Sequence, residues 1–157
     1  MRKVTIHDLD PPSTTSPAYV LPLGDPLGTT HLSINYFELD PGDQFGYEFH
    51  RHLDQEEVFY IQQGTATFET SDDEIEVSAG EAIRFSPGEF QLGRNLGASK
   101  VIALALGAPK GTEEIEYYRQ CPACETRTIQ PVTFDSEERI VRISCAECDS
   151  LVEEIAL

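Results

Sequence analysis

All four cysteines of the chain fall into two short pairs, Cys121/Cys124 and Cys145/Cys148, with twenty residues between the pairs. A Cys-x-x-Cys turn presents two thiolates to one ion, and two such turns complete the closed tetrahedron of structural zinc. Two disulfides or a redox-active pair are the alternatives. A reducing compartment disfavours disulfides, and the chain lacks the βαβ pattern that accompanies redox Cys-x-x-Cys motifs. The spacing therefore predicts a structural zinc ion held by four thiolates.

A second set of donors surrounds His50 and His52. Side chains alternate along a strand, so both imidazoles point to one face. With a carboxylate from Glu56 or Glu57 they offer three donors suited to Fe, Mn, Ni, Cu or Zn. Taken alone, a His-x-His pair is as typical of two partly exposed histidines on a strand as it is of a metal site. Glu48 has the same parity and is a candidate catalytic acid or base, a fifth donor, or a solvated carboxylate.

Short strand-like runs separated by turn residues must position these side chains. They recur at roughly 8–12-residue spacing, which indicates an all-β sandwich or barrel, and no helical period interrupts them. The runs are His31–Leu39, Val58–Gln62, Thr65–Thr70, Ile75–Val77, Ala82–Phe85 and Lys100–Leu106.

The composition divides the chain into four parts. Residues 1–29 are rich in Pro, Ser, Thr and Gly and predict an extended lead-in, with one edge strand near Ala18–Leu21. Residues 30–108 form the barrel, 109–120 a linker and 121–157 a second unit. A unit of that size cannot stabilise itself by core burial alone, so zinc has a structural reason to be there.

The second unit contains two strand-like runs, Thr126–Phe134 and Arg139–Ser144, joined by an acidic turn. Together with the cysteine spacing they predict a small zinc-ribbon β-hairpin. Glu125 and Asp149 follow the two cysteine turns where ribbons commonly have glycine, so these turns are expected to be distorted.

Two motifs in the barrel region resemble those of the cupin superfamily, which implies a double-stranded β-helix, or jelly-roll, barrel. The first motif is a glycine, His-x-His, a glutamate and a second glycine. The second is a glycine, Pro-x-Gly, a third metal histidine and an asparagine. The matching residues are Gly42, His50, His52, Glu57 and Gly64, then Gly80, Gly88 and Asn95, whereas Ser86 stands where the proline of Pro-x-Gly usually is.

Gln91 stands where the family usually has the third metal histidine. The resemblance implies a barrel metal (Zn, Mn, Ni or Fe) held by His50, His52, Glu57 and Gln91, with Glu57 preferred to Glu56 on motif register. In one alternative Gln91 contacts only a bound ligand. In another the barrel is degenerate and binds no metal. The favoured interpretation predicts two independent metals per chain.

The resemblance implies a protein that acts on or binds a small polar metabolite, similar to a sugar phosphate or a keto acid. The glutamine fits an isomerase or lyase better than a dioxygenase, because its carbonyl is a weaker donor than imidazole. The rival is a non-catalytic module that senses a metabolite or metal and signals to a protein partner through the ribbon. A scaffolding role is the third alternative.

The charge of the chain is −17, from 28 acidic and 11 basic residues. Such a surface repels nucleic acid, which is bound through clustered Lys and Arg. Three lysines among the bases indicate a halophilic, haloarchaeal source, with an ordinary acidic cytosolic protein as the alternative. No apolar run is long enough to cross a membrane and no signal peptide is evident. We therefore expect a cytoplasmic protein, assembled as a homodimer.

Overall fold

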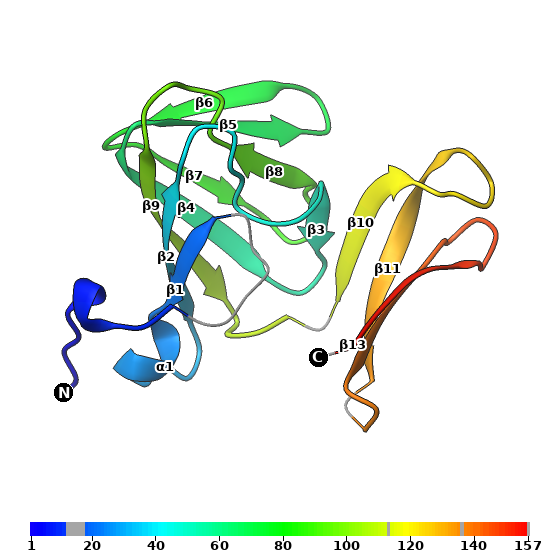
Figure 1. Ribbon diagram of the computed structural model, residues 1–157, viewed down its shortest axis with the longest axis horizontal. Coiled ribbons are helices and arrows are strands. Elements are labelled where there is room, and N and C mark those ends of the chain that lie inside the picture. Colours follow the sequence, from blue (N-terminus) through cyan, green and yellow to red (C-terminus); the bar gives the residue numbers. More distant parts are fainter. Residues whose placement is uncertain (12–17, 113, 136, 157) are drawn as a thin grey trace.

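The computed structural model describes residues 1–11, 18–112, 114–135 and 137–156. Strands dominate this part of the chain and form two sheets (Figure 1). The first sheet contains, in spatial order, β1 (Tyr19–Pro22), β2 (Ser33–Leu39), β9 (Val101–Ala108), β4 (Glu56–Gln63) and β7 (Ala82–Phe85). The second contains β13 (Leu151–Ala156), β12 (Ile140–Ser144), β11 (Arg127–Asp135), β10 (Ile115–Gln120), β3 (His50–His52), β8 (Gln91–Arg94), β5 (Thr65–Thr70) and β6 (Glu74–Ser78). The all-β class expected from the sequence is confirmed.

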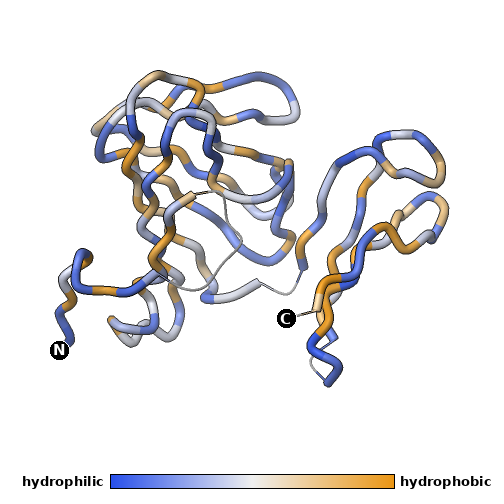
Figure 2. Tube along the Cα trace, viewed as in Figure 1, coloured by the Kyte–Doolittle hydropathy of each residue, from blue (hydrophilic) through white to orange (hydrophobic). Residues whose placement is uncertain are grey.

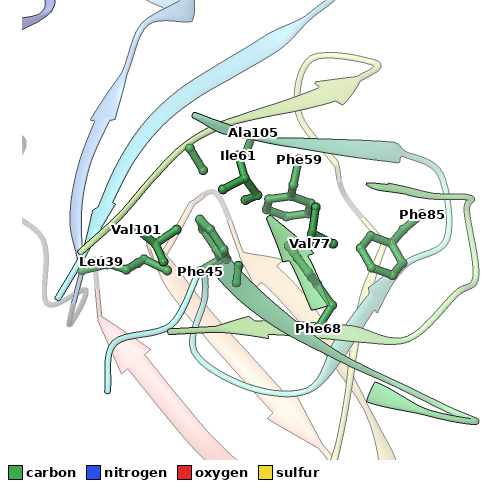
Figure 3. Packing of buried hydrophobic residues seen from close by; sticks show 12 residues of the cluster. Leu39, Phe45, Phe59, Ile61, Phe68, Val77, Phe85, Val101 and Ala105 are labelled. Carbon is green, nitrogen blue, oxygen red and sulfur yellow. The ribbon is translucent and has the colours of Figure 1, made fainter. Parts of the chain in front are cut away.

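The barrel forms where the first sheet packs on β3, β8, β5 and β6 of the second. Its core is aromatic: Phe45 contacts Phe59 and Phe68 with ring centroids 5.2 and 5.7 Å apart, and Phe85 closes the cluster (Figure 3). Leu39, Ile61, Phe68 and Val101 are fully buried. Each such side chain contributes about 1.5–3 kcal/mol through burial. The core therefore anchors β4, one of the three strands that carry the candidate site.

The N-terminal residues pack more closely than an extended lead-in would. The expected edge strand is present as β1, which pairs antiparallel with β2. Around it lie a 3-10 turn (Ile6–Asp8) and a short helix, α1 (Gly24–Leu27). Leu21, Leu23 and Tyr36 form a second apolar cluster with partly buried side chains from both turns. Residues 12–17 of the expected lead-in lie outside the described residues.

The segment expected as a linker contains strand β10, which joins barrel and ribbon in one sheet. On one edge β10 pairs with β3, and on the other it pairs along its whole length with β11. The strands β10–β13 therefore extend the second barrel sheet sideways (Figure 1). The expected ribbon hairpin corresponds to β11 and β12, and β13 adds a strand that the sequence pattern did not indicate.

Two residues of the cupin-like motifs hold turns. Gly64, between β4 and β5, has a φ of 79°, and a Cβ there would lie 2.7 Å from the Lys100 carbonyl oxygen. Asn95 is fully buried and its amide donates to the carbonyls of Leu39 and Ser99. Both residues thus fix the barrel framework. No helix among the described residues is long and apolar enough to span a membrane.

Candidate metal sites

The barrel site is assembled from three strands. His50 and His52 lie on β3, Glu57 lies near the start of β4, and Gln91 begins β8. His50 and Gln91 are directly paired across β3 and β8, so their side chains point to the same face. Glu57 shares the inward parity of the buried Phe59 on β4. The strand pairing thus directs all four side chains into the barrel.

These side chains converge on one point. One donor atom from each of His50, His52 and Glu57 lies within 4.8 Å of the others. The Glu57 Oε2 is 3.4 Å from the His52 Nε2 and accepts a 3.0 Å hydrogen bond from the Gln91 Nε2. The same amide nitrogen is 3.3 Å from the His50 Nε2. The donors are therefore close enough for a single ion to reach them all.

Burial shapes the protonation of this site. Desolvation lowers the pKa of His50, and desolvation together with the neighbouring His50 lowers the pKa of His52 to about 4. Desolvation raises the pKa of Glu57 to about 7, against the opposing hydrogen bond from Gln91. Both imidazoles are thus neutral near pH 7 and ready to donate lone pairs, whereas the carboxylate lacks a compensating positive charge.

The donor set fits a metal ion, and two polar atoms of its residues find no hydrogen-bond partner. The His52 Nδ1 and the Gln91 Oε1 are buried without a hydrogen-bond partner, an arrangement that costs free energy. The His50 Nδ1 is 2.7 Å from the Glu48 carbonyl oxygen, which fixes its proton there and leaves Nε2 as the donor. Rotating the Gln91 amide by 180° would turn its oxygen toward Glu57 and His50.

The two remaining acidic candidates lie outside this cluster. The Glu56 carboxylate pairs with Arg84 at 2.7 Å on the outer face of β4, so Glu57 is the carboxylate that faces the histidines. Glu48 lies before β3 begins, and its carboxylate is 3.5 Å from the Arg119 guanidinium. The strand parity expected for Glu48 does not apply there, because the chain bends before His50. Glu48 contributes its backbone carbonyl instead.

The four cysteines form a second cluster at the far end of the ribbon strands. Their sulfur atoms all lie within 4.8 Å of one another, and the pairs Cys121–Cys148 and Cys124–Cys145 are each 3.9 Å apart. A tetrahedral zinc ion with Zn–S bonds of about 2.3 Å has sulfur–sulfur edges of about 3.8 Å. All four are free thiols, too far apart for disulfides. The geometry therefore matches a closed zinc site.

The two cysteine turns share one backbone geometry. Glu125 and Asp149 have left-handed φ values of 58° and 55°. Their amides donate to the carbonyls of Cys121 and Cys145 at 2.9 and 3.0 Å. These residues therefore adopt the conformation that glycine usually supplies, at a cost of about 1 kcal/mol each. The expected distortion of the turns is not seen.

Hydroxyl groups surround the sulfurs, a feature that the cysteine spacing alone did not reveal. Thr126 and Ser150, each two residues after a cysteine turn, lie 3.3 and 3.0 Å from the Cys124 and Cys148 sulfurs. The buried Thr128 hydroxyl is 3.3 Å from Cys145 and lowers its pKa. Hydrogen bonds from its own turn lower the pKa of Cys121 to about 6. In the sequence, both Cys-x-x-Cys turns are followed by an acidic residue and then a hydroxyl residue, and this repeated pattern could have indicated the hydroxyl contacts.

The cupin domain model matches residues 35–107 of this chain. No curated protein sequence matches it. A sugar phosphate isomerase of the cupin superfamily from Silicibacter pomeroyi has a similar structure, with a TM-score of 0.70 and 20% identity, over 85% of this chain and 80% of that one.

Two further solved structures share the fold. A polyketide cyclase from Streptomyces resistomycificus has a TM-score of 0.61 and 23% identity, over 73% of this chain and 83% of that one. A predicted oxalate decarboxylase from Thermotoga maritima has a TM-score of 0.52 and 21% identity, over 59% and 81%. These findings support the cupin superfamily for the barrel and confirm the expected fold class. At such identities the likeness concerns the fold alone.

Proposed function

We propose that this chain is a metal-binding cupin protein whose barrel site binds or converts a small polar metabolite. His50, His52, Glu57 and Gln91 would hold one divalent transition metal. The observation that carries the proposal is the convergence of two neutral imidazoles and a carboxyl group, all partly buried, with unpartnered polar atoms beside them. In a purely structural core the two buried atoms without a partner, His52 Nδ1 and Gln91 Oε1, would also be hydrogen-bonded.

The site residues favour proton-transfer or lyase chemistry over oxygen chemistry. A bound divalent metal supplies a Lewis acid that polarises a carbonyl or hydroxyl oxygen. The Glu48 carbonyl orients His50 before any ligand enters, whereas the Gln91 amide, whose nitrogen now donates to Glu57, must turn its oxygen toward a bound metal. The glutamine carbonyl suits Zn, Mn or Ni better than a site tuned for iron and dioxygen.

The ribbon completes the proposal as a structural unit that holds zinc through Cys121, Cys124, Cys145 and Cys148. The two 3.9 Å sulfur pairs and the hydroxyl groups around them support this role. Closed four-thiolate sites leave no coordination position for a substrate. We therefore assign any chemistry to the barrel and none to the ribbon.

A non-catalytic sensor is the second candidate, and the shared strand β10 favours it. Strand β10 pairs both with β3, which carries the barrel histidines, and with the ribbon strand β11. A ligand bound in the barrel would therefore alter the ribbon surface through this strand. In that case the ribbon would present a protein partner with a surface that depends on the ligand. Ligand-dependent capture of a partner without turnover would favour the sensor.

Metal analysis by mass spectrometry tests the central proposal. The wild-type chain should carry two metals, the double variant His50→Ala/His52→Ala one, and the control Glu56→Gln two. If the histidine variant keeps the wild-type metal content, the barrel site is not a metal site. The cysteine site serves as the internal standard, because zinc bound there should persist in all three proteins.

Four expectations, on source, location, nucleic-acid binding and assembly, remain part of the proposal. The excess of acidic residues supports a salt-adapted, cytoplasmic protein of haloarchaeal source that avoids nucleic acid. We also propose a homodimer. Sedimentation in low and in molar salt tests the salt adaptation and the homodimer. A salt-adapted chain should be more compact and better assembled in molar salt.

A further inference from the structure

The sheet face that carries the barrel histidines continues onto the ribbon as an apolar surface. His52 is paired with Ile115 on β10, Ile115 with Val132 on β11, and Val132 with Ile143 on β12. Directly opposed residues of antiparallel strands point to the same face, with Cβ atoms about 5 Å apart. A row of aliphatic side chains therefore begins next to the metal-binding histidine and leads away from it.

This row is part of a groove of about 490 Å³, within the size range of small-molecule sites. Figure 2 shows hydrophobic segments along the ribbon strands that form it. The groove is lined mainly by Ile115, Tyr117, Val132, Val141, Ile143 and Ile155. Tyr117 also contacts His50, with ring centroids 6.3 Å apart. Tyr117 therefore lines the groove and lies beside the His50 ring, although none of the four barrel donors lines the groove itself.

The charged residues of the groove are already paired. Arg119 is the one cation among the described lining residues, and its guanidinium lies 2.7 Å from Glu153 and 3.5 Å from Glu48. Its Nε also donates to the buried Gln130 at 2.9 Å. Phosphate recognition needs free cationic donors. A groove with one cation between two carboxylates is therefore a poor phosphate site and a good site for the uncharged part of a ligand.

We propose that this groove holds the apolar or aromatic body of an oxo acid or enol whose oxygen atoms reach the barrel donors. The inference rests on the proposed function, because the barrel site binds the polar end. The side chains of His52 and Glu57 keep exposures of 12% and 19%, so the donors are accessible. The groove thus selects against sugar phosphates and for ligands with one oxygen-rich end and one apolar end.

Calorimetric titration of the metal-loaded full chain with three probes tests this proposal. Phenylpyruvate should bind at least about tenfold more tightly than pyruvate, because its ring is removed from water in the groove. Glucose 6-phosphate should bind no more tightly than pyruvate. Equal affinities of phenylpyruvate and pyruvate, or a preference for the sugar phosphate, would overturn the proposal.

A matched pair of variants on β11 locates the site. Val132 faces the groove, and its neighbour Thr133 is exposed on the opposite face. Val132→Asp should weaken phenylpyruvate binding about tenfold and leave pyruvate binding unchanged, whereas Thr133→Asp, with the same added charge, should alter neither. Val132→Ala provides a milder variant with an expected severalfold loss, should the aspartate prevent folding.

The outcomes separate this inference from the proposed function. If metal analysis finds no barrel metal and phenylpyruvate still binds in a manner that depends on Val132, the groove stands and the metal assignment fails. If the barrel metal is present and phenylpyruvate has no advantage, the groove assignment fails alone. If Val132→Asp converts a dimer to a monomer without changing phenylpyruvate binding, the groove is an interface between copies and the inference is overturned.

Discussion

The two candidate metal sites of this chain differ in how they are held together. The ribbon cysteines approach from two turns of similar geometry, held by backbone hydrogen bonds of the turns and by hydroxyl contacts to the sulfurs. The barrel donors lie on strands of the barrel itself, and Glu57 shares β4 with the core residues Phe59 and Ile61. We therefore expect the ribbon to depend more on a bound metal for its structure than the barrel does. This difference determines what each variant should do.

The largest effect should follow the loss of a ribbon thiolate. Cys121→Ser removes one of four ligands, and structural zinc contributes about 10–16 kcal/mol of apparent binding free energy to small units of this kind. We expect loss of one zinc per chain and loss of hydrogen-exchange protection across β11–β13. The control Ser150→Ala removes only a hydroxyl contact and should keep the zinc. Full protection of these strands in zinc-free Cys121→Ser would contradict the expectation that the ribbon depends on zinc for its structure.

The next effect should follow the loss of the barrel carboxylate. Glu57→Gln removes the one anionic donor and should lower barrel metal affinity about a hundredfold, while the barrel stays folded. Glu56→Gln, one residue away on the outer face, should leave the affinity unchanged. Competition with a chromophoric chelator measures both constants. Equal losses in the two variants would mean that the charge of the strand, not coordination, governs binding.

Gln91→His tests how the donor at position 91 sets the metal affinity of the barrel. A histidine at the start of β8 restores the usual third imidazole of the cupin motif and offers a stronger donor than an amide oxygen. We expect barrel affinity for Zn²⁺ or Ni²⁺ to rise about tenfold. Gln91→Leu, which has no donor, should lower it. A lower affinity in the histidine variant would show that Gln91 serves the site through its amide hydrogens, as a hydrogen-bond donor.

The pH dependence should also separate the two sites. The pKa of Glu57 is raised to about 7 in the metal-free barrel, so this carboxyl is largely protonated at pH 6 and must lose its proton to bind metal. Barrel affinity should therefore fall about tenfold from pH 8 to pH 6, with about one proton displaced. His52, with a pKa of about 4, adds nothing in that range. A barrel metal affinity that does not change between pH 8 and pH 6 would contradict a carboxyl group that must lose a proton to bind the metal.

Ribbon affinity should fall more steeply over the same range. Several thiols must lose protons there, although the lowered pKa of Cys121 moderates the dependence. Calorimetry in buffers of different ionisation enthalpy counts the protons released at each site. Fewer protons from the ribbon than from the barrel would reverse the comparison.

Both candidate donor sets could be proposed from the sequence because short local motifs begin each of them. The cysteine pairs and the His-x-His pair are short motifs whose alternation or spacing fixes the geometry, and motif register favoured Glu57, which the structure places in the cluster. Most barrel strands also matched the predicted runs. Thr65–Thr70 and Ala82–Phe85 have the expected bounds.

What the sequence did not reveal depends on pairing between distant residues. Ile115–Gln120 lies in a stretch with a glycine and several glutamates, so its composition suggested a linker. Its strand conformation comes from hydrogen bonds to β3 and β11 on both edges. The groove and the contact of Glu48 with Arg119 follow from the same pairing. Strand periodicity carries no information about which edges meet.

The smallest expected effect tests whether the two sites are independent, as the sequence suggested. Strand β3 has three residues, a single paired position with β8, and three with β10. Arg51 of β3 is 2.6 Å from Glu116 of β10, which strengthens that contact. Strand β10 in turn runs directly into Cys121. Ordering of the ribbon by zinc should therefore stabilise the strand that positions His50 and His52.

We expect barrel metal affinity to fall about fivefold in Cys121→Ser, at the low end of coupling between sites. Glu116→Gln, which weakens the contact between β3 and β10 but spares both ligand sets, should reduce this coupling without removing either metal. A chelator titration of the barrel in the single and double variants measures the interaction. Identical barrel affinities with and without ribbon zinc would show that β3 holds its histidines unaided. A fivefold difference that disappears with Glu116 altered would instead make β10 the physical link between the two regions.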